Sequence, residues 1–141
     1  MIAALVGAAA ITVFLAYELP RFRDARQVAL GQSVYAANCA QCHGRKLEGQ
    51  PDWQAPLANG RLPAPPHDAS GHTWHHSDEM LFNITRNGLK PYAGETYESD
   101  MPVFADILKD EEIRAAIEFI KSTWPERERD YQRQMTLQQR K

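Results

Sequence analysis

The sequence predicts an all-α domain that follows one hydrophobic segment. Three stretches carry apolar residues at helical spacing, over about residues 24–38, 77–88 and 110–124. No stretch alternates apolar and polar residues as a half-buried strand would, and no internal repeat is present. With 141 residues the chain has room for one domain plus appendages, and a net charge of −2 gives no indication of nucleic-acid binding.

The hydrophobic segment covers residues 1–19. Between Ile2 and Tyr17 there is no charge, and about 16 apolar residues at 1.5 Å each span roughly 24 Å, the short end of a membrane crossing. Because no basic residue precedes Arg21 and no small-residue cleavage site follows the apolar run, an uncleaved anchor is favoured over a signal peptide. The arginines just after the segment favour a cytoplasmic C-terminal side, which opposes the location expected below.

The first predicted helix, over residues 24–38, places Val34 and Tyr35 on its apolar face. Gly31 lies inside this helix, where glycine costs about 1 kcal/mol relative to alanine. A second helix crossing closely over Gly31 would explain that cost, and a tolerated surface glycine is the alternative.

Cys39, Cys42 and His43 follow in the order Cys-Ala-Gln-Cys-His, and the chain has no other cysteine. A structural zinc site needs four ligands, and no second cysteine pair completes one. A thioredoxin-like motif needs strands around it, whereas this motif follows a helix. The pattern is the one that attaches haem c: each sulfur forms a thioether, and the histidine binds the iron. We expect one covalent haem c.

Residues 44–71 are rich in turn residues and predict a long irregular loop that wraps a haem edge. Four histidines then fall within ten residues, and imidazole suits copper and zinc. Packing beside the haem and helix capping are the alternatives to a metal site. The four are His67, His72, His75 and His76.

The second predicted helix has Ser77 as its N-cap and Gly88 at its end. A second loop covers residues 89–104, and Asp110 is expected to cap the third helix. The polar tail, residues 125–141, is predicted to be mobile or to form an extra helix.

The sixth iron ligand is predicted to be Met101. Met80 falls on an apolar helix face and is more typical of a core residue, and Met135 sits in the polar tail. Met101 lies in a loop, 58 positions after His43, and Pro102 stiffens the backbone behind it. A soft thioether suits reduced iron and raises the reduction potential. A histidine from the cluster above is the rival ligand.

The chain resembles the class I c-type cytochromes, the small single-haem bacterial kind, over about residues 25–124. The resemblance rests on the haem motif, the preceding helix with Gly31 and Tyr35, the loop at residues 100–104 and the last helix with Phe119. It implies an all-α class I cytochrome c fold in which the first and last helices cross, with Gly31 against that aromatic residue.

The resemblance also implies that His43 and Met101 are the axial ligands. In that family a proline carbonyl accepts a hydrogen bond from the proximal imidazole and fixes its orientation. Pro56, 13 positions after His43, fits the usual separation best. The fallback choices in the same loop are Pro63, Pro65 and Pro66.

We therefore expect an anchor at residues 1–19, a cytochrome c domain at residues 20–124 and a polar tail. The expected function is electron transfer without catalysis, by a haem domain in the periplasm held at the bacterial inner membrane. A quinol-oxidising complex, a terminal oxidase or another reductase or oxidase would be the redox partner. A haem enzyme or ligand sensor with an open or histidine-ligated sixth position is the alternative.

Overall fold

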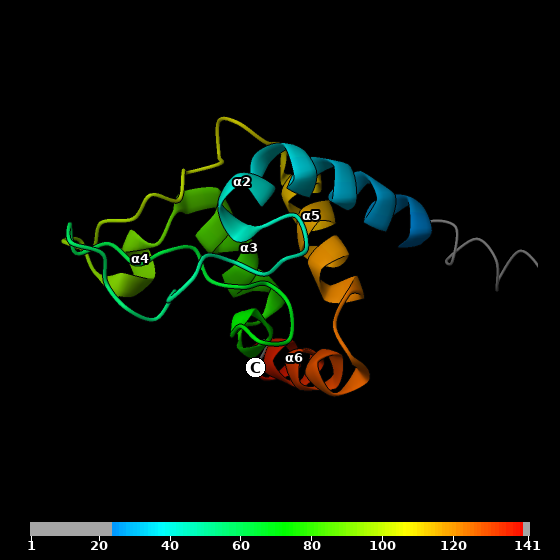
Figure 1. The fold of residues 1–141 in the computed structure, drawn as a ribbon. Coiled ribbons are helices and arrows are strands. Elements are labelled where there is room, and N and C mark those ends of the chain that lie inside the picture. Colours follow the sequence, from blue (N-terminus) through cyan, green and yellow to red (C-terminus); the bar gives the residue numbers. More distant parts are fainter. Residues whose placement is uncertain (1–23, 140–141) are drawn as a thin grey trace, which may run out of the picture.

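The computed structural model describes residues 24–139 as helices joined by long loops, with no strand in that range (Figure 1). The first helix covers residues 24–38. The later elements are α2 (Ala40–His43), the 3-10 turn η1 (Thr73–His75), α3 (Asp78–Asn87), α4 (Lys90–Ala93), α5 (Asp110–Ser122) and α6 (Glu126–Gln139). The all-α class is confirmed for these residues.

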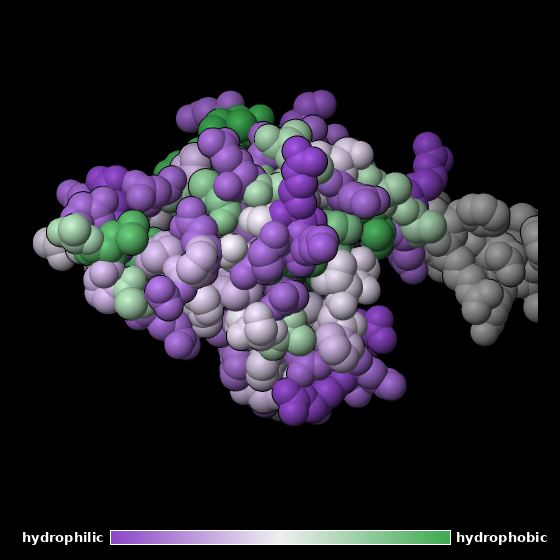
Figure 2. Space-filling model, in the orientation of Figure 1, coloured by the Kyte–Doolittle hydropathy of each residue, from purple (hydrophilic) through white to green (hydrophobic). Residues whose placement is uncertain are grey.

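The expected anchor at residues 1–19 lies outside the residues that the structure describes. Within residues 24–139, no helix is both long enough and apolar enough to cross a membrane. Hydrophilic side chains cover most of the face shown in Figure 2, and hydrophobic ones form small separate patches.

The first helix crosses α5 at Gly31. A Cβ atom at this position would lie 2.5 Å from the carbonyl carbon of Ala115 and 2.9 Å from the Cβ of Phe119, and nearer still to the Ala115 oxygen. Only a residue without a side chain lets the two backbones approach this closely. The predicted crossing of Gly31 over Phe119 is confirmed.

The ends of α3 are those that the sequence predicts. The Ser77 hydroxyl accepts a hydrogen bond from the Met80 amide at 3.2 Å, and acidic residues occupy the first turn, where the helix dipole favours them. Gly88 ends the helix with a φ of 84°, in the left-handed region that glycine tolerates.

The start of α5 differs by one residue from the prediction. Lys109, and not Asp110, occupies the N-cap position. Its amide donates a hydrogen bond of 2.8 Å to the carboxylate of Glu112. The Glu112 carboxylate thus accepts the hydrogen bond of a backbone amide at the start of the helix, so no aspartate is needed at the N-cap.

Two apolar clusters hold the helices together. One lies between α3 and α5 and consists of Leu81, Phe82, Phe104, Ile113 and Ile117. The other joins the first helix, the loop after α2 and the end of α5 with the residues after it, and consists of Tyr35, Leu47, Ile120 and Trp124.

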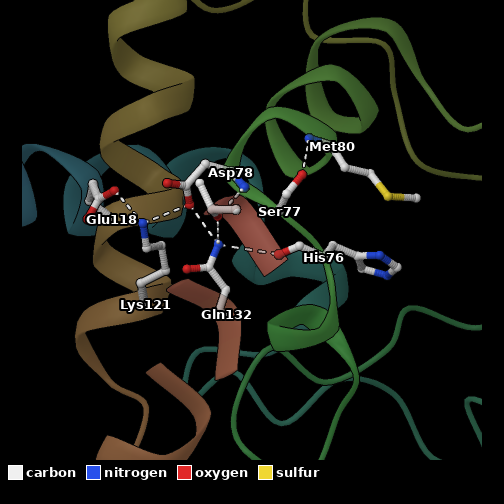
Figure 3. Close-up of polar contacts among 8 residues, drawn as sticks. His76, Ser77, Asp78, Met80, Glu118, Lys121 and Gln132 are labelled. Carbon is white, nitrogen blue, oxygen red and sulfur yellow. Dashed lines mark hydrogen bonds and ion pairs between the residues drawn. The ribbon is translucent and has the colours of Figure 1, made fainter. Parts of the chain in front are cut away.

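The polar tail forms the helix α6, one of the two outcomes that the sequence left open, and α6 packs against η1 (Figure 1). Gln132 is 1% exposed, and its side-chain nitrogen donates a hydrogen bond of 2.7 Å to the Asp78 carboxylate (Figure 3). Lys121 donates to the same oxygen at 2.8 Å. Asp78 at the start of α3 therefore joins α5 and α6 through one partly buried polar network.

Candidate haem site

The two cysteines lie on a single turn of helix directly after the first helix. The amides of Cys42 and His43 donate to the Cys39 carbonyl at 3.2 Å and 3.0 Å, so the turn holds all three residues together. Neither sulfur is in a disulfide; Cys39 is half-buried and Cys42 is exposed. Burial, with the nearby Cys42, raises the pKa of the Cys39 thiol to about 11. Both thiols are free to form covalent bonds.

Tyr35 fixes the end of this turn. The side chain is 2% exposed, and its hydroxyl donates a hydrogen bond of 2.9 Å to the carbonyl of Gly44, the residue directly after His43. Burial raises the pKa of Tyr35, so the hydroxyl keeps the proton that it donates. Tyr35 thus connects the first helix to the last residue of the haem motif.

His43 is buried, and its Nδ1 lies 2.8 Å from the carbonyl oxygen of Pro65. A carbonyl only accepts, so Nδ1 carries the proton and Nε2 keeps a free lone pair. Burial lowers the pKa of His43, while the hydrogen bond to Pro65 opposes that shift, and the neutral form is favoured overall. Nε2 is therefore prepared to bind a metal ion.

The prediction of Pro56 as the acceptor is wrong. Pro56 is exposed, and Pro65, 22 positions after His43, makes the hydrogen bond. Residues 51–63 form a loop whose two ends lie side by side, because the Gln50 amide donates a hydrogen bond of 2.9 Å to the Ala64 carbonyl. This loop lengthens the sequence between His43 and its acceptor without increasing their distance in space. The usual number of positions between the histidine and the proline therefore identified the wrong proline.

His67 stacks on His43, with ring centroids 4.0 Å apart and an interplanar angle of 22°. Its Nδ1 lies 2.8 Å from the Thr73 hydroxyl, and its carbonyl accepts a hydrogen bond of 2.7 Å from Trp124. Because His67 stacks on His43, it lies on the same side of the site as the imidazole that would bind the iron. His67 is therefore not placed opposite His43, and although packing was among the alternatives for the histidine segment, the sequence did not indicate His43 as its partner.

The other histidines take part in aromatic packing. His72 stacks on Trp53 at a centroid distance of 5.3 Å, and His75 lies between Trp74 at 3.8 Å and Tyr131 at 5.2 Å. Across residues 24–139, no group of three or more His, Cys, Asp or Glu side chains is placed to hold a metal ion. His72 and His75 therefore pack on aromatic side chains in this segment.

Met101 is half-buried, packs against the cluster between α3 and α5, and lines a cavity of about 300 Å³. Met80 is half-buried on α3 and does not line this cavity. Met135 lies on α6. Residues that share the cavity wall with Met101 include Arg61, Leu89, Tyr97, Glu98 and Val103.

The family described as Cytochrome c matches residues 28–124, more than half of the chain. The chain belongs to the cytochrome c family. It is 27% identical over 96 residues to a protein of Sinorhizobium medicae named Cbb3-type cytochrome c oxidase subunit FixP. That match covers 67% of this chain and 29% of the relative, so the chain spans less than a third of that protein's length. No solved structure matches the chain significantly.

The cofactor of this cytochrome is haem c, bound covalently, and Cys39 and Cys42 have the spacing that its attachment needs. The side chains present fit that group. Two thiols outside any disulfide share one turn with an imidazole whose Nε2 is free. The cavity that Met101 lines has neither cysteine nor His43 in its wall, so the fit rests on the motif residues. The family and its relative support electron transfer as the activity of the domain.

Proposed function

We propose that this cytochrome is a membrane-anchored electron carrier with a single haem ligated by His43 and Met101. The observation that carries the proposal is the hydrogen bond from His43 Nδ1 to Pro65 at 2.8 Å. It gives an imidazole of fixed orientation and tautomer, one residue after a cysteine pair, and this is what a permanent proximal ligand requires.

Each side chain has one role in this proposal. Cys39 and Cys42 form the thioether bonds, which prevent loss of the cofactor, and His43 Nε2 supplies the fifth ligand. Met101 supplies the sixth ligand, whose softness favours the reduced state. When bound, the haem supplies a one-electron couple. If His43 and Met101 both bind the iron, substrates would have no access to the metal, and the domain would act as a carrier.

The relative's name places that protein in a cbb3-type oxidase. We infer that the redox partners of this chain belong to a respiratory complex, either a terminal oxidase or a quinol-oxidising complex that supplies the electrons. The hydrophobic residues 2–19 would hold the domain at the bacterial inner membrane, with the haem in the periplasm, and raise its concentration near those partners.

Covalent attachment is tested by mass. Denatured protein should retain a mass increase of one haem, and the double substitution Cys39→Ala with Cys42→Ala should release the haem on denaturation. Retention of haem by the double variant would refute the thioether bonds.

The sixth ligand is tested by a matched pair of methionine variants. Met101→Ala should abolish the sulfur-to-iron band in the far red of the oxidised spectrum, open the reduced iron to carbon monoxide and lower the reduction potential. Met80→Leu exchanges hydrophobic side chains of similar volume, so the spectrum should be unchanged and stability should fall by less than about 1.5 kcal/mol. The opposite pattern would assign the ligand to α3.

Anchoring is tested by fractionation and intact mass. The chain should be recovered from the membrane fraction with residues 1–19 present, and a protease added to intact spheroplasts should reach the haem domain. A soluble mature protein that begins near residue 20 would refute the anchor.

A further inference from the structure

The segment that carries Met101 has few attachments of its own. Residues 95–103 contain no helix, and Val103 is 52% exposed. Within the segment, the Met101 amide donates to the Ser99 hydroxyl at 3.1 Å. Among the residues that the structure describes, every hydrogen bond from this segment to a distant part of the chain goes to Arg61.

Arg61 contacts two carboxylates on either side of Ser99. Its Nη2 and Nε lie 3.0 Å and 3.3 Å from one carboxylate oxygen of Glu98, and its Nη1 pairs with Asp100. The hydrogen bonds to Glu98 and Asp100 raise the pKa of the guanidinium, which remains charged. Since Asp100 directly precedes Met101, the guanidinium holds the backbone one residue away from the thioether.

Arg61 is itself fixed by a tight turn. The Leu57 amide donates to the Arg61 carbonyl at 2.9 Å, and the Arg61 amide donates to the Asn59 side chain at 3.0 Å. Four residues later the same loop provides the Pro65 carbonyl that holds His43. One loop therefore contacts both the proximal histidine and the segment of the distal methionine.

We propose that Arg61 is a positioning residue that holds the Met101 segment in place beside the cavity that both line, through its ion pairs with Glu98 and Asp100. The inference rests on the proposed ligation by Met101. Exposed ion pairs usually contribute little to global stability. Here a planar guanidinium on a fixed turn supplies the segment's hydrogen bonds to the rest of the domain, so its loss acts on local opening.

The rate at which imidazole displaces the sixth ligand of the oxidised protein measures this opening. Arg61→Gln should accelerate displacement by roughly threefold to tenfold, the scale of one or two surface ion pairs. Arg61→Lys keeps the charge without the planar group and should give a smaller acceleration. Arg133→Gln removes the same charge from α6, where Arg133 pairs with Asp130, and should leave the rate unchanged.

Two further measurements separate this mechanism from others. High salt should raise the displacement rate of the wild type towards that of Arg61→Gln, because screening weakens exposed ion pairs. The rate of the variant should change little. Glu98→Gln combined with Asp100→Asn should accelerate displacement to a similar extent, and adding Arg61→Gln to that pair should have no further effect. Additive effects would overturn the proposal, since Arg61 would then act through another group.

The spectrum of the oxidised wild type distinguishes the two possible failures. If the sulfur-to-iron band is present and Arg61→Gln exchanges at the wild-type rate, the positioning role is refuted and Met101 ligation stands. If the wild type lacks the band, Met101 is not the ligand, and both the proposed ligation and the role of Arg61 are overturned.

Discussion

Replacing Gly31 by alanine should destabilise the folded cytochrome, although alanine is the better helix former. Helix propensity alone favours the variant by about 1 kcal/mol. The new methyl group would lie 2.5 Å from the Ala115 carbonyl carbon and 2.9 Å from the Phe119 Cβ. Overpacking typically costs about 1–3 kcal/mol, and the upper value applies because backbone atoms of α5 cannot rotate away. We expect a net loss of about 2 kcal/mol.

The free energy of unfolding of the haem-loaded protein, from denaturant titrations followed by circular dichroism, measures this loss. Ala29 is exposed on the same helix, so Ala29→Gly reports propensity without a crossing partner and should cost about 1 kcal/mol. The inference would be contradicted if Gly31→Ala raised the free energy of unfolding by about 1 kcal/mol. It would also be contradicted if Gly31→Ala left that free energy unchanged while Ala29→Gly lowered it as expected.

Two further predictions concern the proximal side and the histidine segment. Trp124→Phe leaves the His67 carbonyl without its donor, so unfolding free energy should fall by about 1–3 kcal/mol in denaturant titrations; an unchanged value would contradict the buried hydrogen bond. Burial and two neighbouring histidines lower the pKa of His76, so the folded state binds fewer protons than the unfolded state below about pH 6.5. Stability should therefore fall as the pH drops from 7 to 5, and His76→Gln should reduce this fall in melting temperature; an equal fall in the variant would assign the pH dependence to other groups.

The parts of the fold that the sequence predicted depend on local patterns. The haem motif occupies five consecutive residues, the Ser77 cap acts within one turn, and Gly31 is the one glycine within the first helix. The motif and the cap are complete within a few positions, so spacing was sufficient for them, whereas the crossing at Gly31 was predicted from the family resemblance.

The parts that could not be predicted depend on contacts between distant segments. Pro65 replaces Pro56 because the Gln50–Ala64 hydrogen bond closes an excursion whose length no local pattern records. Arg61 faces carboxylates 37 and 39 positions away, and surface arginines rarely have a recognisable partner in sequence. The α6 helix packs through polar and aromatic side chains, among them Gln132 and Tyr131, so it shows no apolar stripe that would indicate packing.

The measurement that tests the account most directly is the optical spectrum of the wild-type protein in both oxidation states. His43 and Met101 ligation predicts a sulfur-to-iron band in the far red of the oxidised spectrum and no ready binding of carbon monoxide by the reduced protein. An oxidised spectrum without that band, together with rapid carbon monoxide binding, would contradict the electron-carrier account and indicate an open iron site.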